Sequence, residues 1–281
     1  MSLLSNLRKI TRQRLSNHGG KSNLRLLNPL PLPNTAHLQN KEEIYKWIKY
    51  GIGAFREWYQ PVDFGNGVIA HRTFPPDWQP QPDLLYANDA GMAKWNYIIK
   101  RHLPQIQGKR VLDLGSSSGI FSIELARMGA KEVIGIDRNP GISHRSTATP
   151  PAQDVVAQAN FVKKSFELLE EVRYPVTFIA QDIAKLEELK LGRFDLILAL
   201  NVIYHELDNM PKLIRQLVGM TDYLILQACE GHVGELKKWA NKLCHAELLL
   251  EAGFSNVEID APDGYLMPVV IGRKGKNING G

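Results

Sequence analysis

Cysteine is scarce in this sequence, where only Cys229 and Cys244 occur among 281 residues. Both lie among residues whose pattern predicts buried strand or helix, which argues against a disulfide framework and favours a reducing, cytoplasmic compartment. No run approaches the roughly 18 apolar residues of a membrane-spanning helix. The first residues also lack the apolar stretch of about 7–15 residues that marks a signal peptide. We therefore expect neither secretion nor a membrane span.

Acidic residues are missing from the first 41 positions, which hold seven of the 34 basic residues. The rest of the chain has 27 basic and 29 acidic residues, so the net charge of +5 belongs to the N-terminal segment. Apolar residues at helical spacing predict a basic amphipathic helix over residues 2–15, and the prolines of residues 28–34 predict an extended linker. Such an arm is suited to RNA phosphates, a membrane surface or a protein partner, although most arms of this kind are solvated tails.

Three segments are predicted along the chain: a basic arm and Pro-rich linker over residues 1–40, an N-terminal helical cap over 41–100, and the main domain over 101–281. The overall composition, 44% hydrophobic and 22% charged, is ordinary for a soluble globular protein. In the cap, apolar and aromatic residues at helical spacing predict one helix from Lys41 to Tyr59, interrupted near two glycines, and another from Gly91 to His102.

From residue 109 onwards, predicted strands alternate with predicted helices. This alternation is typical of an α/β fold with a parallel sheet and helices on both faces. The last two strands are close in sequence, which predicts a hairpin that adds an antiparallel strand. The predicted strands cover residues 110–114, 132–137, 177–181, 194–200, 223–228, 256–260 and 269–272, and the predicted helices cover 119–129, 152–171, 209–219 and 235–252.

A glycine-containing turn follows the first of these strands, in the sequence Asp113-Leu-Gly-Ser-Ser-Ser-Gly119. Glycine lets the backbone approach a ligand closely, and the helix that follows aims its N–H groups at that ligand. The spacing differs from the dinucleotide fingerprint G-x-G-x-x-G, because Gly115 and Gly119 are four residues apart with Ser117 between them. A nicotinamide dehydrogenase is therefore a minor alternative function. A further alternative is that the segment is an ordinary strand-to-helix turn that binds no ligand.

Carboxylates end the next two predicted strands. Asp137 lies 18 residues beyond Gly119, where an acid can accept both ribose hydroxyls of an adenine nucleotide. Asp182 ends the third strand and could accept the adenine amino group, while Ile183 packs on the ring. Asp137 alone would as readily be a helix cap or a surface acid, and for Asp182 alone such a structural role would be favoured. The prediction therefore depends on the series of three acid-tipped strands.

These motifs, together with the strand Phe194–Asn201, resemble the class I S-adenosylmethionine-dependent methyltransferases over about residues 94–273. The resemblance implies a Rossmann-like seven-stranded, mostly parallel sheet of order 3-2-1-4-5-7-6. It also implies S-adenosyl-L-methionine as cofactor and S-adenosyl-L-homocysteine as product. The family often has Gly where this chain has Ser117. Carried over residue by residue, the cofactor-binding positions are Asp113, Gly115, Ser116, Ser117, Gly119, Asp137, Arg138, Asp182, Ile183 and Asn201.

A looser resemblance involves Lys94-Trp95 and Val202-Ile-Tyr-His205, which are similar to the branch that contains the tRNA wobble-uridine carboxymethyltransferase. That branch often has a basic residue directly after Tyr-His, whereas this chain has Glu206. Transfer of a carboxymethyl group calls for a cation beside the extra carboxylate, so this departure argues against that reaction here.

Acceptor chemistry is predicted just beyond the fourth strand, at the edge where open α/β sheets place ligands. His205 is the first choice for a general base because its pKa is near neutrality, and a cap for the next helix is the alternative role. Tyr204 is an acceptor contact or a core residue. No His, Asp or Glu cluster has convincing metal-ligand spacing. The predicted walls of the acceptor pocket are His71, Arg72, Tyr86, Trp95 and Tyr97, most of which would equally serve as packing.

Three functions follow. The favoured one is methyl transfer to an O or N atom of a small-molecule metabolite enclosed by the cap. The second is a tRNA or RNA modification, by methyl or carboxymethyl transfer, in which the arm contacts phosphates. The third is a non-catalytic, cofactor-binding regulatory protein. The sequence leaves the oligomeric state open.

Overall fold

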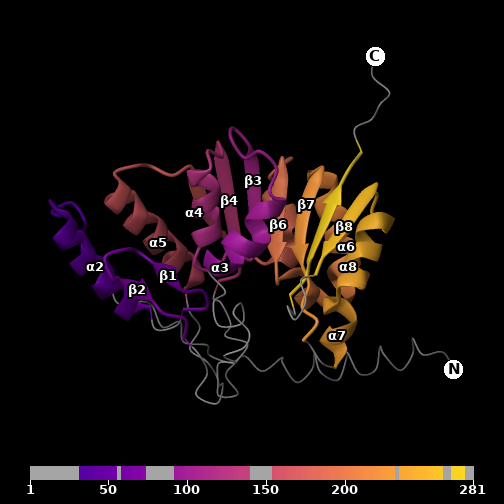
Figure 1. The fold of residues 1–281 in the computed structure, drawn as a ribbon, viewed down its shortest axis with the longest axis horizontal. Coiled ribbons are helices and arrows are strands. Elements are labelled where there is room, and N and C mark those ends of the chain that lie inside the picture. Colours follow the sequence, from indigo (N-terminus) through magenta and orange to yellow (C-terminus); the bar gives the residue numbers. More distant parts are fainter. Residues whose placement is uncertain are drawn as a thin grey trace.

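A computed structural model describes the cap, the sheet and the helices on both of its faces (Figure 1). The predicted helix over residues 2–15 and most of the predicted linker lie outside the described residues. The described residues are 32–55, 58–73, 92–139, 154–231, 234–261 and 267–275.

One seven-stranded sheet forms the centre of the molecule, in the order β5-β4-β3-β6-β7-β9-β8. The first five strands in this order pair in parallel, and β9 then pairs antiparallel with both β7 and β8. The predicted strand order and the terminal antiparallel hairpin are confirmed. The strands are β3 (Arg110–Leu114), β4 (Glu132–Asp137), β5 (Val176–Ala180), β6 (Leu196–Leu200), β7 (Tyr223–Gln227), β8 (Asn256–Asp260) and β9 (Val269–Arg273).

Neighbouring residues of the central strands point to opposite faces and join two separate apolar clusters. Val111 packs with the cap and with the helices α4 and α5, whereas Leu112 packs with α6 and α8 on the other face. Both side chains are fully buried, as expected of strands covered on both faces. The covering helices are α4 (Ile120–Arg127), α5 (Val155–Glu170), α6 (Met210–Met220), α7 (Glu235–Ala240) and α8 (Lys242–Glu251), with 3-10 segments η3 (Ile183–Leu189) and η4 (Ile203–Asn209) after β5 and β6.

The cap lies beside α5 at one end of the sheet (Figure 1) and contains helix α2 (Lys41–Ala54) and a short hairpin of β1 (Val62–Asp63) and β2 (Ile69–Ala70). The predicted interruption is wrong, because α2 continues through Gly51 and Gly53. The predicted extension of the helix to Tyr59 is also wrong, because α2 ends at Ala54. A Cβ at Gly51 would lie 2.1 Å from the ring of Phe161 on α5, so this glycine allows the two helices to approach closely.

The predicted helix over 91–102 is present but irregular. It consists of α3 (Met92–Lys94), a π-helical turn η1 (Trp95–Ile99) and a 3-10 turn η2 (Lys100–His102). The predicted helix over 235–252 is divided at Asn241, whose backbone is extended and whose side chain accepts a hydrogen bond from Cys244 N–H. Asn241 is thus the N-cap of α8. Asn is strongly preferred at this position and disfavoured inside helices, because its side chain hydrogen-bonds to nearby backbone groups.

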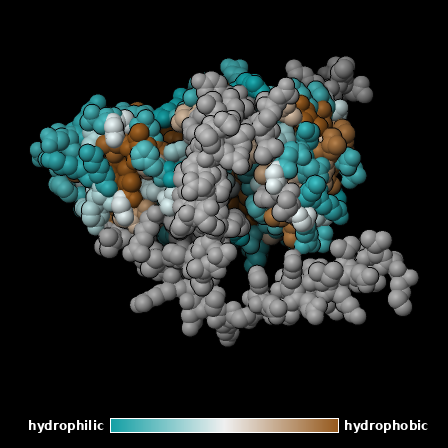
Figure 2. Space-filling model, turned by 60° about the horizontal axis from the view of Figure 1, so that its bottom comes forward, coloured by the Kyte–Doolittle hydropathy of each residue, from teal (hydrophilic) through white to brown (hydrophobic). Residues whose placement is uncertain are grey.

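Hydrophilic residues cover much of the visible surface, and apolar residues gather at the cap end and at the opposite end of the molecule (Figure 2). Among the described residues, no helix combines the length and the apolar character needed to cross a membrane.

Candidate functional site

The predicted cofactor residues come together at the carboxyl edge of the sheet, around β3. This strand pairs with β4 on one side and β6 on the other, so the chain crosses from one half of the sheet to the other beside it. Ligands of open α/β sheets bind at such a reversal point. The turn after β3 and the ends of β4 and β6 therefore form the candidate site.

The turn after β3 holds three residues with positive φ: Gly115 at 73°, Ser117 at 50° and Gly119 at 76°. A Cβ at Gly119 would lie 2.3 Å from the Phe178 ring, so only glycine fits there. Ser117 adopts the left-handed conformation despite its side chain, which costs on the order of 1–2 kcal/mol. The N–H groups of Gly115 and Ser116 both donate to the carbonyl of Ile136 (2.8 and 3.1 Å), which ties the turn to β4.

Asp137, at the end of β4, faces this turn. Its Oδ2 accepts the Ser117 N–H and its Oδ1 accepts the Arg138 N–H, both at 2.8 Å. Burial raises the pKa of Asp137 above its ordinary value, while the two N–H donors act in the opposite direction. Each carboxylate oxygen keeps a lone pair, so the group can still accept hydroxyl donors.

Asp113 lies inside the site rather than at its surface. Ser122 Oγ donates to Asp113 Oδ2 at 2.6 Å, and both residues are buried. Burial raises the pKa of Asp113 to about 6. Lys94, 4% exposed, is also buried; burial lowers its pKa to about 7, while the charge of Asp113 acts in the opposite direction. The pair places a cation and an anion beneath the turn.

The end of β5 is more open. Asp182 is exposed and begins η3, where its carboxylate accepts the Ala184 N–H at 2.9 Å, so its observed contact is a helix cap. Ile183 is buried in the apolar cluster below the sheet. Glu206 from η4 approaches this corner: burial raises its pKa, the charge of Asp182 adds to the rise, and Arg138 opposes it.

Asn201 follows β6 with φ of 58°, a left-handed conformation that Asn tolerates better than most residues. Its Nδ2 donates to the sulfur of Met267 at 3.3 Å. Its Oδ1 is buried and has no donor among the residues that the structure describes. A buried acceptor without a donor is rare in folded proteins, and it suits a ligand that carries an N–H group.

Tyr204 and His205 follow on η4, with ring centroids 4.5 Å apart. Tyr204 is 3% exposed, and burial raises its pKa; its hydroxyl hydrogen-bonds with the Cys229 thiol, whose pKa burial also raises. The fully buried His245 also stacks on Tyr204, with ring centroids 6.2 Å apart. His205 is half-buried, so it remains accessible to a ligand.

The predicted cap residues are dispersed. His71 is exposed, and Trp95 is buried against Phe121 with ring centroids 5.3 Å apart, so its contact is core packing. Tyr86 and the side chain of Tyr97 lie outside the described residues. Arg72 lies over the Tyr59 ring at 5.2 Å, and its charge lowers the pKa of Lys94, which places it on the site side of the cap.

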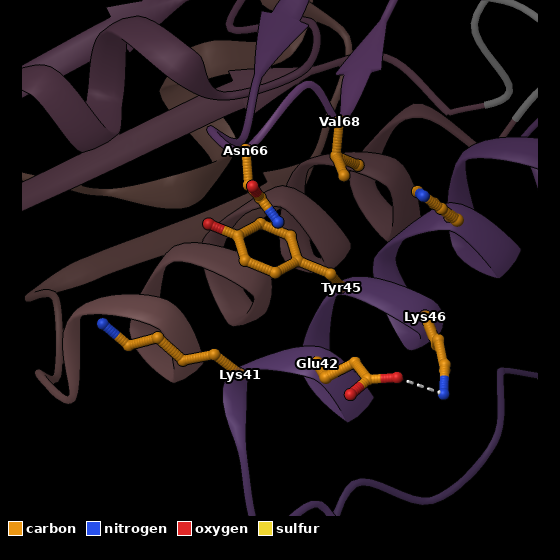
Figure 3. Close-up of a pocket in the computed structure, with 7 residues that line it drawn as sticks. Lys41, Glu42, Tyr45, Lys46, Asn66 and Val68 are labelled. Atoms are coloured by element: carbon orange, nitrogen blue, oxygen red, sulfur yellow. Dashed lines mark ion pairs between the residues drawn. The ribbon is translucent and has the colours of Figure 1, made fainter.

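A separate groove of about 610 Å³ lies on the outer side of the cap, along α2 and the β1–β2 turn (Figure 3). Lys46 forms an ion pair with Glu42 there, at 2.7 Å. None of the predicted site residues lines this groove, so it is distinct from the site at the sheet edge. Its lining residues are Lys41, Glu42, Tyr45, Lys46, Lys49, Asn66 and Val68.

Three buried polar groups at the site were not predicted from sequence. In the sequence, Lys94 was noted only as part of the Lys94-Trp95 motif. Because a lysine is seldom fully buried, no pattern predicted a buried ammonium group at the site. Ser118 Oγ donates to Gln60 Oε1 of the cap at 2.8 Å, across 58 residues of sequence. The contact of Ser122 with Asp113 becomes evident only once α4 is placed against β3, because the turn separates the two residues in sequence.

The site suits a cofactor with hydroxyl groups near Asp137 and an amino group near Asn201. The Asp137 carboxylate retains free lone pairs, and Asn201 Oδ1 has no donor within the described residues, so both can accept hydrogen bonds from such groups. No group of three or more metal-ligating side chains occurs within the described ranges.

Comparison with known proteins identifies a family. Residues 89–241 match the family described as "Methyltransferase domain". The chain is 30% identical over 142 residues to the ribosomal protein L11 methyltransferase of Exiguobacterium sibiricum, covering 46% of this chain and 43% of that protein. It is 30% identical over 219 residues to the tRNA U34 carboxymethyltransferase of Haemophilus influenzae, covering 66% and 61%. The chain thus spans about half the length of these relatives.

Among solved structures, the N-terminal domain of EvdMO1 with bound SAH is similar, with a TM-score of 0.56 and 17% identity. The match covers 86% of this chain and 100% of that one. At this identity the similarity shows a shared fold.

Proposed function

The chain belongs to the methyltransferase domain family, within the class I S-adenosylmethionine-dependent methyltransferases, and from this premise we propose that it transfers a methyl group from S-adenosylmethionine to an O or N atom of a small-molecule acceptor. In this proposal residues 1–40 are an arm, residues 41–100 cover the acceptor, and residues 101–281 bind the donor. The observation that carries it is the convergence of Asp113, Asp137 and the turn 115–119 at one edge of the sheet.

On the donor side, we assign the ribose hydroxyls to Asp137 and the amino group of the methionine part to Asn201 Oδ1. Asp113 holds the turn in place through Ser122 rather than facing solvent. Asp182, Ile183 and Arg138 border the adenine. When bound, the cofactor supplies an electrophilic methyl group on a positively charged sulfur.

On the acceptor side, this chain's residues orient the nucleophile and remove its proton. His205 is half-buried at the carboxyl edge, and a neutral imidazole there can take the proton of a hydroxyl or an ammonium group. Tyr204 does not fit that role, because burial raises the pKa of its hydroxyl, which therefore stays protonated and does not accept the proton. It acts as a positioning contact for His205, and the cap excludes water, so orientation supplies much of the acceleration.

A second candidate is transfer of a carboxymethyl group to RNA, and one observation favours it. The sequence lacks a basic residue after Tyr204-His205, yet the structure places the buried Lys94 near Cys229, the hydrogen-bond partner of Tyr204. A cation there could hold an extra carboxylate on the donor. The tRNA U34 carboxymethyltransferase of Haemophilus influenzae is a relative of this chain.

The test combines binding with an acceptor search. Calorimetry should show S-adenosylmethionine binding, and methyl-labelled cofactor incubated with cell extract should label a small molecule. Label in RNA that disappears when residues 1–30 are deleted would favour RNA modification, and carboxymethyl transfer is tested in the same way with a donor that carries a carboxylate on its methyl group. Binding without transfer from either donor to any fraction would instead indicate a regulatory protein, and absence of binding to both donors would exclude both enzymatic functions.

A further inference from the structure

One hydrogen bond connects the cap directly to the cofactor turn. Ser118 Oγ donates to Gln60 Oε1 at 2.8 Å. Both residues are buried: Ser118 is fully inaccessible and Gln60 is 5% exposed. The contact therefore lies inside the molecule, where a hydroxyl that loses its acceptor has no water to replace it.

Gln60 occupies a fixed position in the cap. Burial alternates along residues 58–62, with Trp58, Gln60 and Val62 inside and Tyr59 outside. Trp58 is held by its indole N–H, which donates to the Ile52 carbonyl at 3.3 Å, and by packing against Phe161 of α5. The Gln60 side chain is thus delivered by a segment that is itself anchored on the main domain.

The turn that receives this hydrogen bond has a conformation that needs external support. Ser117, next to Ser118, is left-handed without being glycine, and the residues at both ends of the turn also have positive φ. From the β4 side, Asp137 holds Ser117 through its N–H. From the cap side, Gln60 holds Ser118 through its side chain. Two adjacent residues of the turn are therefore fixed from opposite directions.

We propose that Gln60 is a positioning residue for the methyl donor, acting through Ser118 to hold the turn 115–119 in its cofactor-binding conformation. This inference rests on the proposed function, because it assumes that the turn binds S-adenosylmethionine. It also has a reciprocal consequence. Since binding free energies are linked, an acceptor that stabilises the cap tightens donor binding by the same factor by which the donor tightens acceptor binding.

The test measures the affinity of the full chain for S-adenosylhomocysteine by titration calorimetry. Gln60→Met keeps the shape and removes the acceptor oxygen, and it should weaken binding about tenfold, the effect of losing one buried hydrogen bond. Ser118→Ala should weaken binding by a similar factor. The double variant should be no weaker than the weaker single variant, because both remove the same interaction. Gln60→Glu, which restores an acceptor oxygen, should recover most of the affinity.

Asn40→Ala is the matched control. Asn40 Oδ1 accepts the Glu43 N–H at 3.0 Å, so this variant loses a hydrogen bond at the start of α2 that involves neither the turn nor the segment around Trp58. It should lower the melting temperature and leave the affinity of the folded protein unchanged. If Gln60→Met does not fold, Ser118→Ala together with Ser118→Thr, which keeps the hydroxyl, replaces it in the comparison.

The outcomes separate the two proposals. If the wild-type chain binds and Gln60→Met or Ser118→Ala binds equally well, Gln60 does not position the donor and this inference is overturned. Multiplicative effects of the two substitutions, or an equal loss of affinity in Asn40→Ala, overturn it as well. If the wild-type chain does not bind S-adenosylhomocysteine, the proposed function fails and the inference fails with it.

Discussion

The two halves of the sheet's carboxyl edge are built from different chemical groups. Beyond β3 and β4, carboxylates hold backbone N–H groups, as Asp137 does with Ser117. Beyond β6 and β7 the groups are mostly side chains without a carboxylate, namely Asn201, Tyr204, His205 and Cys229, with Glu206 and Glu230 as exceptions. The first half presents fixed hydrogen-bond acceptors, and the second presents a half-buried imidazole beside an aromatic ring.

This difference explains why the donor is easier to identify than the acceptor. A ribose calls for a carboxylate at a strand end, a requirement that few other ligands share. A methyl acceptor calls only for a nucleophilic atom and a nearby base, which many molecules satisfy. In the proposed function the cap closes the second half, so part of the lining would depend on tertiary packing rather than on strand position.

The largest expected effect concerns the half of the sheet edge beyond β3 and β4, to which we assign the donor. Asp137→Ala should abolish measurable affinity for S-adenosylhomocysteine, because it removes the proposed ribose acceptor and releases Ser117 N–H. Calorimetry measures the affinity, and circular dichroism verifies folding. Asp222→Ala, at the amino edge of the sheet, is the control and should bind normally. Unchanged binding by the Asp137 variant would show that the ribose contact is assigned to the wrong residue.

The acceptor half is tested by His205→Ala. We expect turnover to fall by about 10²-fold or more, the usual contribution of a general base. Cofactor affinity should change little, because the imidazole is assigned to the acceptor. Steady-state kinetics with the acceptor found in the extract screen provides both parameters, and a pH profile should lose its acidic limb. Equal activity of wild type and variant removes His205 from the mechanism.

Lys94 lies between the two halves, and its titration makes the stability of the chain depend on pH. Burial lowers its pKa in the folded chain to about 7, so between about pH 7 and its ordinary value of 10.5 the unfolded chain holds a proton that the folded chain lacks. Its contribution therefore makes the free energy of unfolding rise with pH across this window.

Lys94→Met should remove that rise. We expect the variant to be more stable than wild type at pH 6, with the advantage shrinking towards pH 10, as seen in melting temperatures at each pH. Its donor binding should weaken, because Asp113 loses the nearby cation. A variant whose melting temperature keeps the wild-type dependence on pH would contradict the assigned burial of the charge.

The smallest effects concern the cap and form a matched pair on α2. A Cβ at Gly51 would overlap the Phe161 ring, so Gly51→Ala should destabilise the chain by about 1–3 kcal/mol. Gly53 has no atom within 4 Å of such a Cβ, so Gly53→Ala should be neutral or stabilise by up to about 1 kcal/mol. Thermal or urea denaturation measures both. Equal effects would mean that α2 is not docked on α5 as described.

Much of the donor half could be predicted from the sequence because its determinants are local. Asp137 directly ends an apolar strand, and the glycine turn directly follows another, so strand position alone brings them together. The strand order followed from the family resemblance, and the sheet confirms it. The predicted roles of the individual site residues remain proposals.

The remaining features depend on contacts between distant segments. The Gln60–Ser118 hydrogen bond joins a loop of the cap to the turn, and no spacing in the sequence signals it. The continuous α2 was interrupted in the prediction because glycine is a poor helix former, whereas packing against Phe161 requires glycine there. Similarly, the hydrophobic pattern over 235–252 did not show that Asn241 divides the helix.

The position of Phe161 limits how the cap could be exchanged for that of another family member. Its ring lies within 5.1–6.3 Å of the rings of Trp47, Phe55, Trp58 and Phe64, four aromatic residues contributed by the cap. A chimaera that carries the cap of another family member would have to match the shape around this one ring before it could present a new pocket. Grafts that include α5 together with the cap should fold more readily than grafts of the cap alone.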